Sequence, residues 1–192
     1  MPIIGTIASQ ISGHLSGPAS YESIQTQTVA SNTQSITFSS IPSTYKDLEI
    51  RYISRDTYTN TFPGLQVLFN GGTFSTVINL FGNGTGTAPG SGQGFAGGYA
   101  YLGWSAGNDI PANLYAGGIL RLFGYASANK TKVFENHTGV QREASSSGSG
   151  YIALYGGSLN STSAITSITF QEGDPNFKLM PGSTYALYGI KG

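Results

Sequence analysis

Hydrophobic and polar residues alternate in short segments over most of the chain. In residues 47–55, DLEIRYISR, the apolar side chains of Leu48, Ile50 and Tyr52 alternate with charged ones. A period of two residues is typical of a β-strand with one buried face. Similar segments, bounded by Gly, Asn, Ser or Pro, recur along the chain, and no segment after residue 20 has a convincing helical period. The pattern predicts about ten strands.

Two pairs of neighbouring segments are predicted to form hairpins. Residues 20–29 and 34–39 both have strand-like composition, and turn-forming residues join them. Residues 65–69 and 74–81 flank the Asn-Gly pair at residues 70–71. Asn-Gly tolerates the positive φ that tight hairpins demand, so this is the strongest turn signal in the chain.

Short strands joined by glycine-rich turns are typical of a sandwich or a barrel. We expect an all-β fold, a jelly-roll-like β-sandwich that forms a single domain over residues 21–192. Residues 82–98 are so rich in glycine that we interpret them as a long loop without a core element. No internal repeat of fixed period is visible, which argues against propellers and solenoids.

Residues 1–20 differ from the rest and are interpreted as a short N-terminal arm. The arm has no acidic or basic residue, and its glycines and Pro18 argue against a stable helix. Two interpretations remain open: a frayed chain end, or an arm that docks on a neighbouring subunit and attaches the protein to a larger assembly. The second follows from five aliphatic side chains that need burial. They are Ile3, Ile4, Ile7, Ile11 and Leu15.

The chain carries few charges. Charged residues make up 9% of its 192 residues, against about 25% in an average soluble protein. Lys plus Arg and Asp plus Glu number 9 each, so the formal net charge is zero. This argues against nucleic acid as a partner, because bulk positive charge is missing. A neutral surface keeps a lone monomer in solution poorly, so the composition favours a protein that works in an assembly.

The sequence contains no cysteine, which excludes a disulfide framework and a thiolate zinc site. The first residues lack the basic and apolar regions of a secretory signal, so we expect none. No apolar stretch approaches the roughly 18 residues of a membrane-spanning helix, so we also expect no membrane partner.

Little in the sequence points to catalysis. Glu135 and His137 lie two residues apart on a predicted strand, so they share a face and offer two metal ligands. The alternative interpretation is a polar strand face, because a metal site needs a third ligand from Asp56, Asp109, Glu172 or Asp174. Residues 92–97 match GxGxxG, but they lie in the glycine-rich loop and open no helix. We therefore expect no enzymatic activity, no cofactor and no required metal.

Four aromatic residues in the middle of the chain form another candidate site. They are Tyr99, Tyr101, Trp104 and Tyr115. Tyr99 and Tyr101 are expected to share one face of a strand. Tyr and Trp combine apolar area with a polar group, and proteins use them at interfaces and sugar-binding surfaces. Core packing, interface contact and carbohydrate stacking all remain open for this cluster.

Several strings of the sequence together resemble a family of structural proteins in tailed phages, particularly phages of cyanobacteria and other marine bacteria. The strings are SYESIQTQTV, SITFSSIPSTYKDLEIR, ANKTK, SAITSITF and the terminal YALYGIKG, and the similarity runs from about Pro2 to Gly192. ITFSSIPSTY and LYGIKG are the most specific parts. The resemblance implies a β-rich, oligomeric virion component, either a capsid decoration (cement) protein or the terminal domain of a tail fibre.

Of these two roles, the sequence favours decoration. Only residues 1–20 precede the β domain, and they show neither heptads nor GxY repeats, so no fibre shaft is visible. We expect a homotrimer on the capsid surface of the virion, assembled in the host cytoplasm, that binds the major capsid protein and bridges neighbouring capsomers. The alternative is a tail fibre tip or receptor-binding module that recognises a host surface glycan.

Overall fold

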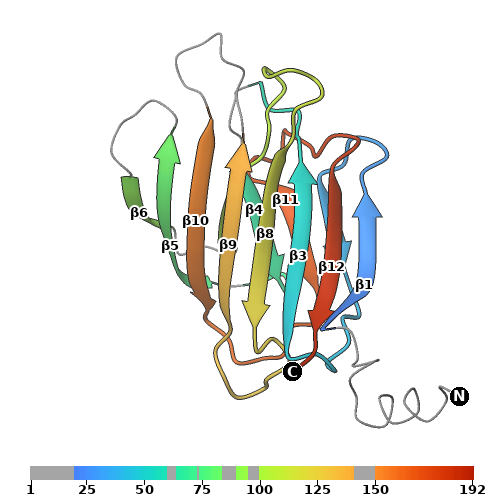
Figure 1. The fold of residues 1–192 in the computed structure, drawn as a ribbon, viewed down its shortest axis with the longest axis vertical. Helices are drawn as coiled ribbons and strands as arrows, with labels where there is room; N and C mark the ends of the chain where they lie inside the picture. The colour runs from blue at the N-terminus through green and yellow to red at the C-terminus, as the bar shows by residue number, and fades with distance from the viewer. Residues whose placement is uncertain (1–19, 60–63, 73, 84–89, 95–99, 141–149) are drawn as a thin grey trace, which may run out of the picture.

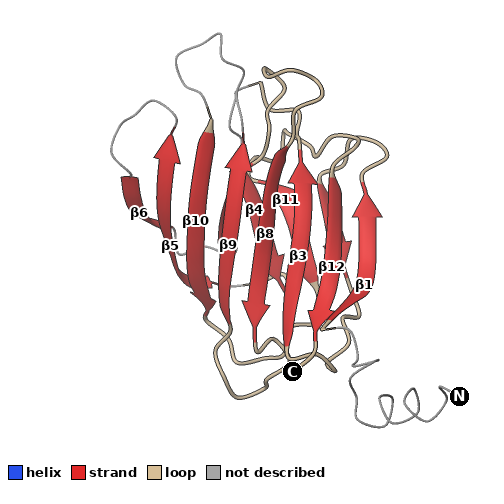
Figure 2. Cartoon of the chain, viewed as in Figure 1, coloured by secondary structure: helices blue, strands red, loops and turns tan. Residues whose placement is uncertain are grey.

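The computed structural model describes residues 20–59, 64–72, 74–83, 90–94, 100–140 and 150–192. These residues form twelve strands and no helix (Figure 2). The strands are β1 Tyr21–Thr28, β2 Ser35–Phe38, β3 Asp47–Ser54, β4 Gly64–Phe69, β5 Phe74–Asn83, β6 Gly90–Gly94, β7 Ala100–Trp104, β8 Ala116–Phe123, β9 Val133–Val140, β10 Tyr151–Leu159, β11 Ile168–Glu172 and β12 Thr184–Ile190.

The strands form two antiparallel sheets that pack face to face. The larger sheet has eight strands in the order β1-β12-β3-β8-β9-β10-β5-β6, and the smaller has four in the order β2-β11-β4-β7. In Figure 1 the larger sheet spans the view, and the smaller sheet lies behind it. The prediction of an all-β sandwich is confirmed.

Eight of the strands follow the order that a jelly roll has. The larger sheet contributes β1-β12-β3-β8, and the whole smaller sheet contributes β2-β11-β4-β7. The remaining four strands come from two insertions, β5–β6 and β9–β10. They extend the larger sheet beyond β8 in the order β9-β10-β5-β6, so this sheet is twice as wide as the one packed against it.

Alternating side chains of the larger sheet fill the space between the layers. Leu48, Ile50 and Tyr52 of β3 point inward and are buried, as the sequence pattern predicts. Tyr52 stacks on Tyr185 of β12 with ring centroids 5.9 Å apart, and Phe170 of the smaller sheet lies 4.8 Å from Tyr185. These rings join the two sheets into one apolar core.

Both predicted hairpins are wrong. In the first, β1 pairs with β12 and β2 pairs with β11, so the two strands lie in different sheets. In the second, the partners of β4 are β11 and β7, whereas the partners of β5 are β10 and β6. The Asn-Gly turn itself is present, because Asn70 and Gly71 have φ of 52° and 69°. However, Asn70 accepts hydrogen bonds from the backbone of Thr166 and Ser167, at 2.9 and 3.1 Å. The turn therefore leads the chain from one sheet to the other.

The prediction that the glycine-rich residues 82–98 form only a loop is wrong in part. Five of its residues, Gly90–Gly94, form β6 and pair with Val77–Phe81 of β5 at the edge of the larger sheet. Backbone hydrogen bonds suffice for such an edge strand, since a ladder needs no side chains. Residues 1–19 of the N-terminal arm lie outside the described residues. In the part that is described, no helix has the length and hydropathy to cross a membrane.

Candidate functional site

The outer face of the larger sheet is the most distinctive surface of the described residues. Its inner face packs against the smaller sheet, whereas several large aliphatic side chains of the outer face are exposed to solvent. Ile152 is 70% exposed and Ile78 is 59% exposed. Leu80, Ile119, Val133 and Leu154 on the same face are exposed as well. These residues lie on β5, β8, β9 and β10, so most of them belong to the two inserted strand pairs.

The strand register arranges this face in rows. One row, running from β3 to β5, consists of Arg51, Ile119, His137, Leu154 and Leu80. The next row consists of Ile53, Gly117, Gly139, Ile152 and Gly82. Three of the five residues in the second row are glycine and carry no side chain. The sheet backbone is therefore open to a bound group between the aliphatic side chains.

This arrangement produces a groove of about 650 Å³, which we call the outer groove. Its floor contains Gly82, Gly117 and Gly139, and its walls include Leu80, Ile119, Ile152 and Leu154. No acidic, lysine or arginine side chain lines it. A second depression of about 510 Å³ adjoins it, lined by Ile78, Leu80, Phe123, Val133, Leu154 and Gly156 among others. Together they form a mainly apolar strip over β8, β9, β10 and β5, which we call the apolar strip; His137 and Glu135 of β9 are polar side chains that line it.

The floor glycines differ from the glycines of the inner face. A Cβ at Gly118, which points inward, would lie 2.3 Å from the hydroxyl oxygen of Tyr52, so core packing excludes any side chain there. A Cβ at the adjacent Gly117 would meet only the Tyr52 carbonyl oxygen at 3.8 Å, and one at Gly139 the Tyr151 carbonyl at 3.5 Å. These are ordinary contacts. The fold of a single chain therefore does not require glycine at the groove floor.

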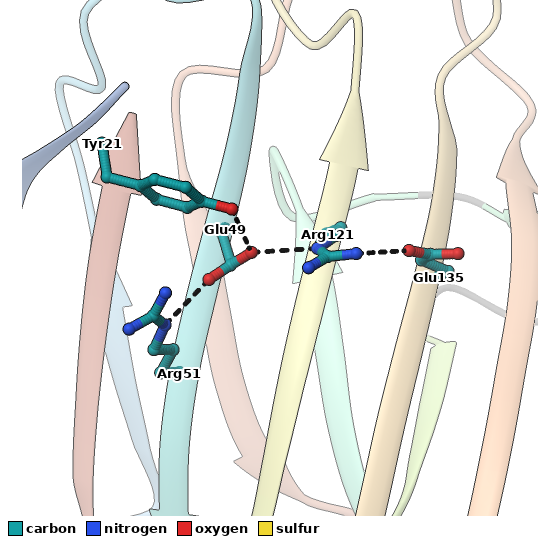
Figure 3. Close-up of polar contacts among 5 residues, drawn as sticks. All are labelled: Tyr21, Glu49, Arg51, Arg121 and Glu135. Atoms are coloured by element: carbon teal, nitrogen blue, oxygen red, sulfur yellow. Dashed lines mark hydrogen bonds and ion pairs between the residues drawn. The ribbon is translucent and has the colours of Figure 1, made fainter. Parts of the chain in front are cut away.

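A charged cluster borders the apolar strip on the side of β3 (Figure 3). Glu49 accepts hydrogen bonds from Nε of Arg51 at 2.8 Å and from Nε of Arg121 at 2.9 Å. The hydroxyl of Tyr21 donates to the same carboxylate, and Arg121 also contacts Glu135 at 3.3 Å. The Glu49 side chain is only 1% exposed although it points away from the core. The outer face is thus divided into a polar part over β1, β12 and β3 and a mainly apolar part beyond the Arg121–Glu135 pair.

The two arginines keep Glu49 ionised. Burial alone raises the pKa of this carboxyl group, but hydrogen bonds and charges from Arg121 and Arg51 outweigh burial and bring the pKa below its usual value. Arg51 in turn lies over the rings of Tyr21 and Tyr188, 5.5 and 5.1 Å from their centroids. The cluster is a fixed structural feature with its charges balanced internally.

The proposed metal ligands do not assemble into a site among the described residues. Glu135 and His137 share the outer face of β9, as predicted, and His137 lies between Ile119 and Leu154 in its row. No described group of three His, Asp or Glu side chains has a metal-binding arrangement. Asp56 and Glu172, two of the candidate third ligands, are buried between the sheets. The polar strand face is the interpretation that fits this geometry.

Asp56 and Glu172 form a buried carboxyl pair that the sequence analysis did not anticipate. Asp56 is fully buried, and Glu172 is 4% exposed. Burial raises the pKa of both groups, and the charge and hydrogen bonding of Asp56 raise that of Glu172 further. The neighbouring Arg55 directs its guanidinium to the carbonyls of Ile110, Pro111 and Leu114 instead of to this pair. Burial and the neighbouring carboxyl group therefore favour a protonated form of this pair over two charged carboxylates.

The predicted aromatic site is divided between different surroundings. Tyr101 and Trp104 of β7 are partly buried against the core, and the Trp104 ring lies 3.5 Å from that of Tyr151. Tyr115 donates a 3.0 Å hydrogen bond to the carbonyl of Pro181. For Tyr101 and Trp104 this geometry supports core packing among the three interpretations. Tyr99 and the arm residues Ile3, Ile4, Ile7, Ile11 and Leu15 lie outside the described residues.

The sequence carries a signal for the outer groove in two strands that lack alternation. Residues 151–155, YIALY, and 77–81, VINLF, are apolar on nearly every position and do not alternate. An apolar run of this kind is typical of a strand that is buried on both faces. Among the described residues the smaller sheet covers only one face of these strands, and Ile78, Leu80, Ile152 and Leu154 on the other face are exposed.

Comparisons with protein-family models, curated proteins and solved structures gave no significant match for this chain. The chemistry of the site therefore rests on its own geometry. That geometry is an apolar, glycine-floored groove beside a neutralised charge cluster. Such a surface suits association with another polypeptide, because it offers aliphatic area and accessible backbone and few polar groups to orient a small substrate.

Proposed function

We propose that this protein is a phage virion structural protein, most simply a capsid decoration protein that stabilises the head shell by bridging neighbouring capsomers. The exposed apolar strip on the outer face of the larger sheet is the single observation that carries the proposal. The resemblance of the sequence to tailed-phage structural proteins and the zero net charge support it. A neutral protein packs at high local density without repelling its own copies.

The proposed mechanism is mechanical. A phage shell must withstand the pressure of packed DNA, and a decoration protein adds buried interface between capsomers. Full burial of one exposed aliphatic side chain stabilises an interface by about 1.5–3 kcal/mol. Ile78, Leu80, Ile152 and Leu154 together therefore supply several kcal/mol per copy. Repetition over the shell multiplies this gain without requiring a strong contact at any one copy.

The geometry supports a protein partner better than the glycan partner of a tail fibre tip. A sugar site uses exposed aromatic rings with polar groups around them. Tyr101 and Trp104, which were candidates for such rings, are partly buried against the core. The outer groove is lined mainly by aliphatic side chains and glycine. The absence of enzymatic activity, cofactor and metal remains a prediction under either role.

Cryo-electron microscopy of the phage particles that contain this protein tests the proposal. Antibody fragments against the sandwich domain mark its position on the particle. We expect the fragments to cover the capsid in a regular lattice at sites between capsomers. Labelling confined to the tail would overturn the decoration role and support the receptor-binding alternative.

A further inference from the structure

We propose that the outer groove binds the N-terminal arm of a neighbouring copy of this chain. The inference goes beyond the proposed function, because it names a second copy as the partner of this surface; the interface that the strip adds to a decorated shell is then one between neighbouring copies of this protein. It concerns the purified protein and does not depend on where the protein sits in a virion. Four features of the chain support it: the composition of the arm, the size of the apolar strip, the reach of the arm and the floor glycines.

The arm and the groove match in chemistry. Residues 1–19 contain no Asp, Glu, Lys or Arg, and their aliphatic side chains are those of Ile3, Ile4, Ile7, Ile11 and Leu15. The groove likewise contains no charged side chain of these four kinds, and its walls are aliphatic. Contact between them buries apolar area on both sides and leaves no charge without solvent or partner. The arm is the longest segment outside the described residues, so it is the natural source of an occupant.

The size of the apolar strip suits a segment better than a whole sheet face. From β8 to β5 the strip is three strand spacings wide, and from Val133 to Gly139 it is six residues long. At about 4.8 Å per spacing and 3.3 Å per residue its area is roughly 300 Å². A stable interface between folded proteins takes about 800 Å² per partner. An extended aliphatic segment fits the smaller area.

The reach of the arm allows this contact, and the polar surface beside β1 favours a neighbouring copy over the same copy. The arm joins β1 at Tyr21, five strand positions from β10. This separation is about 24 Å across the sheet, whereas nineteen extended residues span up to about 60 Å. To reach its own groove, however, the arm must cross the charge cluster in which the half-exposed Arg51 and Arg121 cover the buried Glu49. Aliphatic side chains placed over that cluster would remove water from its charged groups, which costs free energy, and would find no apolar surface to pack against.

The floor glycines indicate that the occupant approaches the sheet closely. Glycine inside a strand costs about 0.5–1 kcal/mol relative to alanine. The space around Gly117 and Gly139 accepts a Cβ in the single chain, so packing within one copy does not explain them. A strand glycine often marks a place where another backbone comes near. An arm-to-groove contact passes from one copy to the next, and it closes into a ring when three copies take part.

Disulfide trapping tests the proposal, because the chain has no cysteine of its own. Three arm variants, Ile4→Cys, Ile7→Cys and Ile11→Cys, are each mixed with Gly139→Cys as purified full-length proteins. Mild oxidation should give a covalent dimer of the two different chains with at least one of the three. The matched control is Thr26→Cys on the polar part of the same outer face, which should give at least tenfold less mixed dimer. Equal trapping at Thr26 and Gly139 would overturn the proposal.

A double variant separates the neighbouring copy from the same copy. In Ile7→Cys combined with Gly139→Cys, an arm that folds over its own sheet gives a cross-linked monomer at high dilution. The proposal predicts cross-linked oligomers instead, which run as monomer on a denaturing gel only after reduction. If the mixtures of an arm variant with Gly139→Cys never cross-link, and the double variant forms its disulfide only within one chain, the arm binds in its own groove and the proposal is wrong.

A change in the groove floor gives an independent measurement. Gly117→Glu places a charge and a side chain in the groove without entering the core, since the Cβ meets only a carbonyl oxygen at 3.8 Å. We expect this variant to keep the melting temperature of the sandwich but to lose the arm cross-link and the oligomer. Thr26→Glu, the matched control, should retain both. An unchanged oligomer in Gly117→Glu would contradict the proposal.

Discussion

Three buried carboxyl groups show two opposite behaviours in the same fold. Glu49 is ionised, because the arginines that cover it supply two hydrogen bonds and compensate its charge. Asp56 and Glu172 lack such a cation, since the nearby Arg55 is used by backbone carbonyls. They keep a proton instead, and one oxygen of each, Asp56 Oδ2 and Glu172 Oε2, has no hydrogen-bond donor among the described side chains and backbone groups.

The carboxyl pair predicts a stability that falls as the pH rises. The pKa of Glu172 is raised above its ordinary value of 4.5 in the folded protein, so unfolding releases a proton. This contribution is fully present below pH 4.5 and is lost as the pH rises through the raised pKa. Glu172→Gln replaces the shared proton with an amide donor. Between roughly pH 5 and pH 8, its free energy of unfolding relative to that of the unchanged protein should rise by about 1 kcal/mol for each pH unit.

Urea unfolding at several pH values measures this difference. Glu135→Gln, which removes a carboxyl group from the outer face of β9, is the matched control and should follow the unchanged protein. A pH slope in Glu172→Gln equal to that of the unchanged protein would show that the pair holds no proton.

Removal of the Glu49 charge should have a moderate cost. Glu49→Gln removes the carboxylate that Arg51 and Arg121 share, but Arg121 keeps its contact with Glu135, and the two arginine side chains are 53% and 44% exposed and remain hydrated. A buried charge left alone would cost more, about 3–5 kcal/mol. We therefore expect a loss of about 1–2 kcal/mol in the free energy of unfolding, measured by urea titration at neutral pH. A loss above 3 kcal/mol would show that the arginines depend on Glu49 for burial.

At the scale of single elements, β8 shows how one strand serves two different surfaces. Its inward positions pack against the core, and Leu120 and Leu122 are fully buried. Its outward positions Ile119 and Phe123 are exposed and belong to the apolar strip. Gly117 and Gly118 are adjacent in sequence but face opposite sides, so they provide an internal comparison.

Alanine substitutions at these two glycines should have opposite effects. In Gly118→Ala, the new methyl group must displace Tyr52, whose hydroxyl hydrogen-bonds to Asn136 at 3.2 Å. We expect a loss of about 1–3 kcal/mol in the free energy of unfolding. Gly117→Ala should be neutral or stabilise the isolated chain by up to about 1 kcal/mol. Chemical denaturation of both variants is the measurement, and a loss of similar size at Gly117 would contradict the assignment of the two faces.

At the scale of the whole molecule, the two insertions make the larger sheet wider than the smaller sheet that covers it. The jelly-roll strands β1, β12, β3 and β8 lie opposite a four-stranded partner, whereas β9, β10, β5 and β6 extend beyond them. On the inner face of β9 and β10, the side chains of Phe134, Tyr151 and Tyr155 belong to the apolar core. The outer face of the extension is the apolar strip. An assembly that covers this strip buries the aliphatic side chains that are exposed in a single chain.

Deletion of residues 2–16 should separate folding from assembly. The described sandwich has its own core, so the shortened protein should fold with a nearly unchanged melting temperature. The full-length chain should scatter light as a homotrimer, with three times the mass of one chain. The shortened protein should be smaller and should no longer decorate particles. Loss of the fold together with the loss of binding would instead assign the arm to the core of its own domain.

The sequence by itself determined the strand content and the inward side chains. Leu48, Ile50 and Tyr52 were assigned to the core correctly, because alternation reflects only local backbone geometry. The all-β class follows from many such segments, and the neutral charge follows from composition. The turn at Asn70 was also local, since its positive φ depends on the residue type.

Only the tertiary structure decided which strands pair and which surfaces remain open. The hairpin predictions were wrong because a turn reverses the chain without specifying its sheet, and β5 pairs with β10, more than sixty residues later, as its register shows. The approach of Asp56 to Glu172 likewise depends on strands distant in sequence. The outer groove arises for the same reason. Alternation gives the face of the sheet on which a side chain lies, but which face the smaller sheet covers and which stays exposed depends on how the strands assemble, which no local pattern encodes.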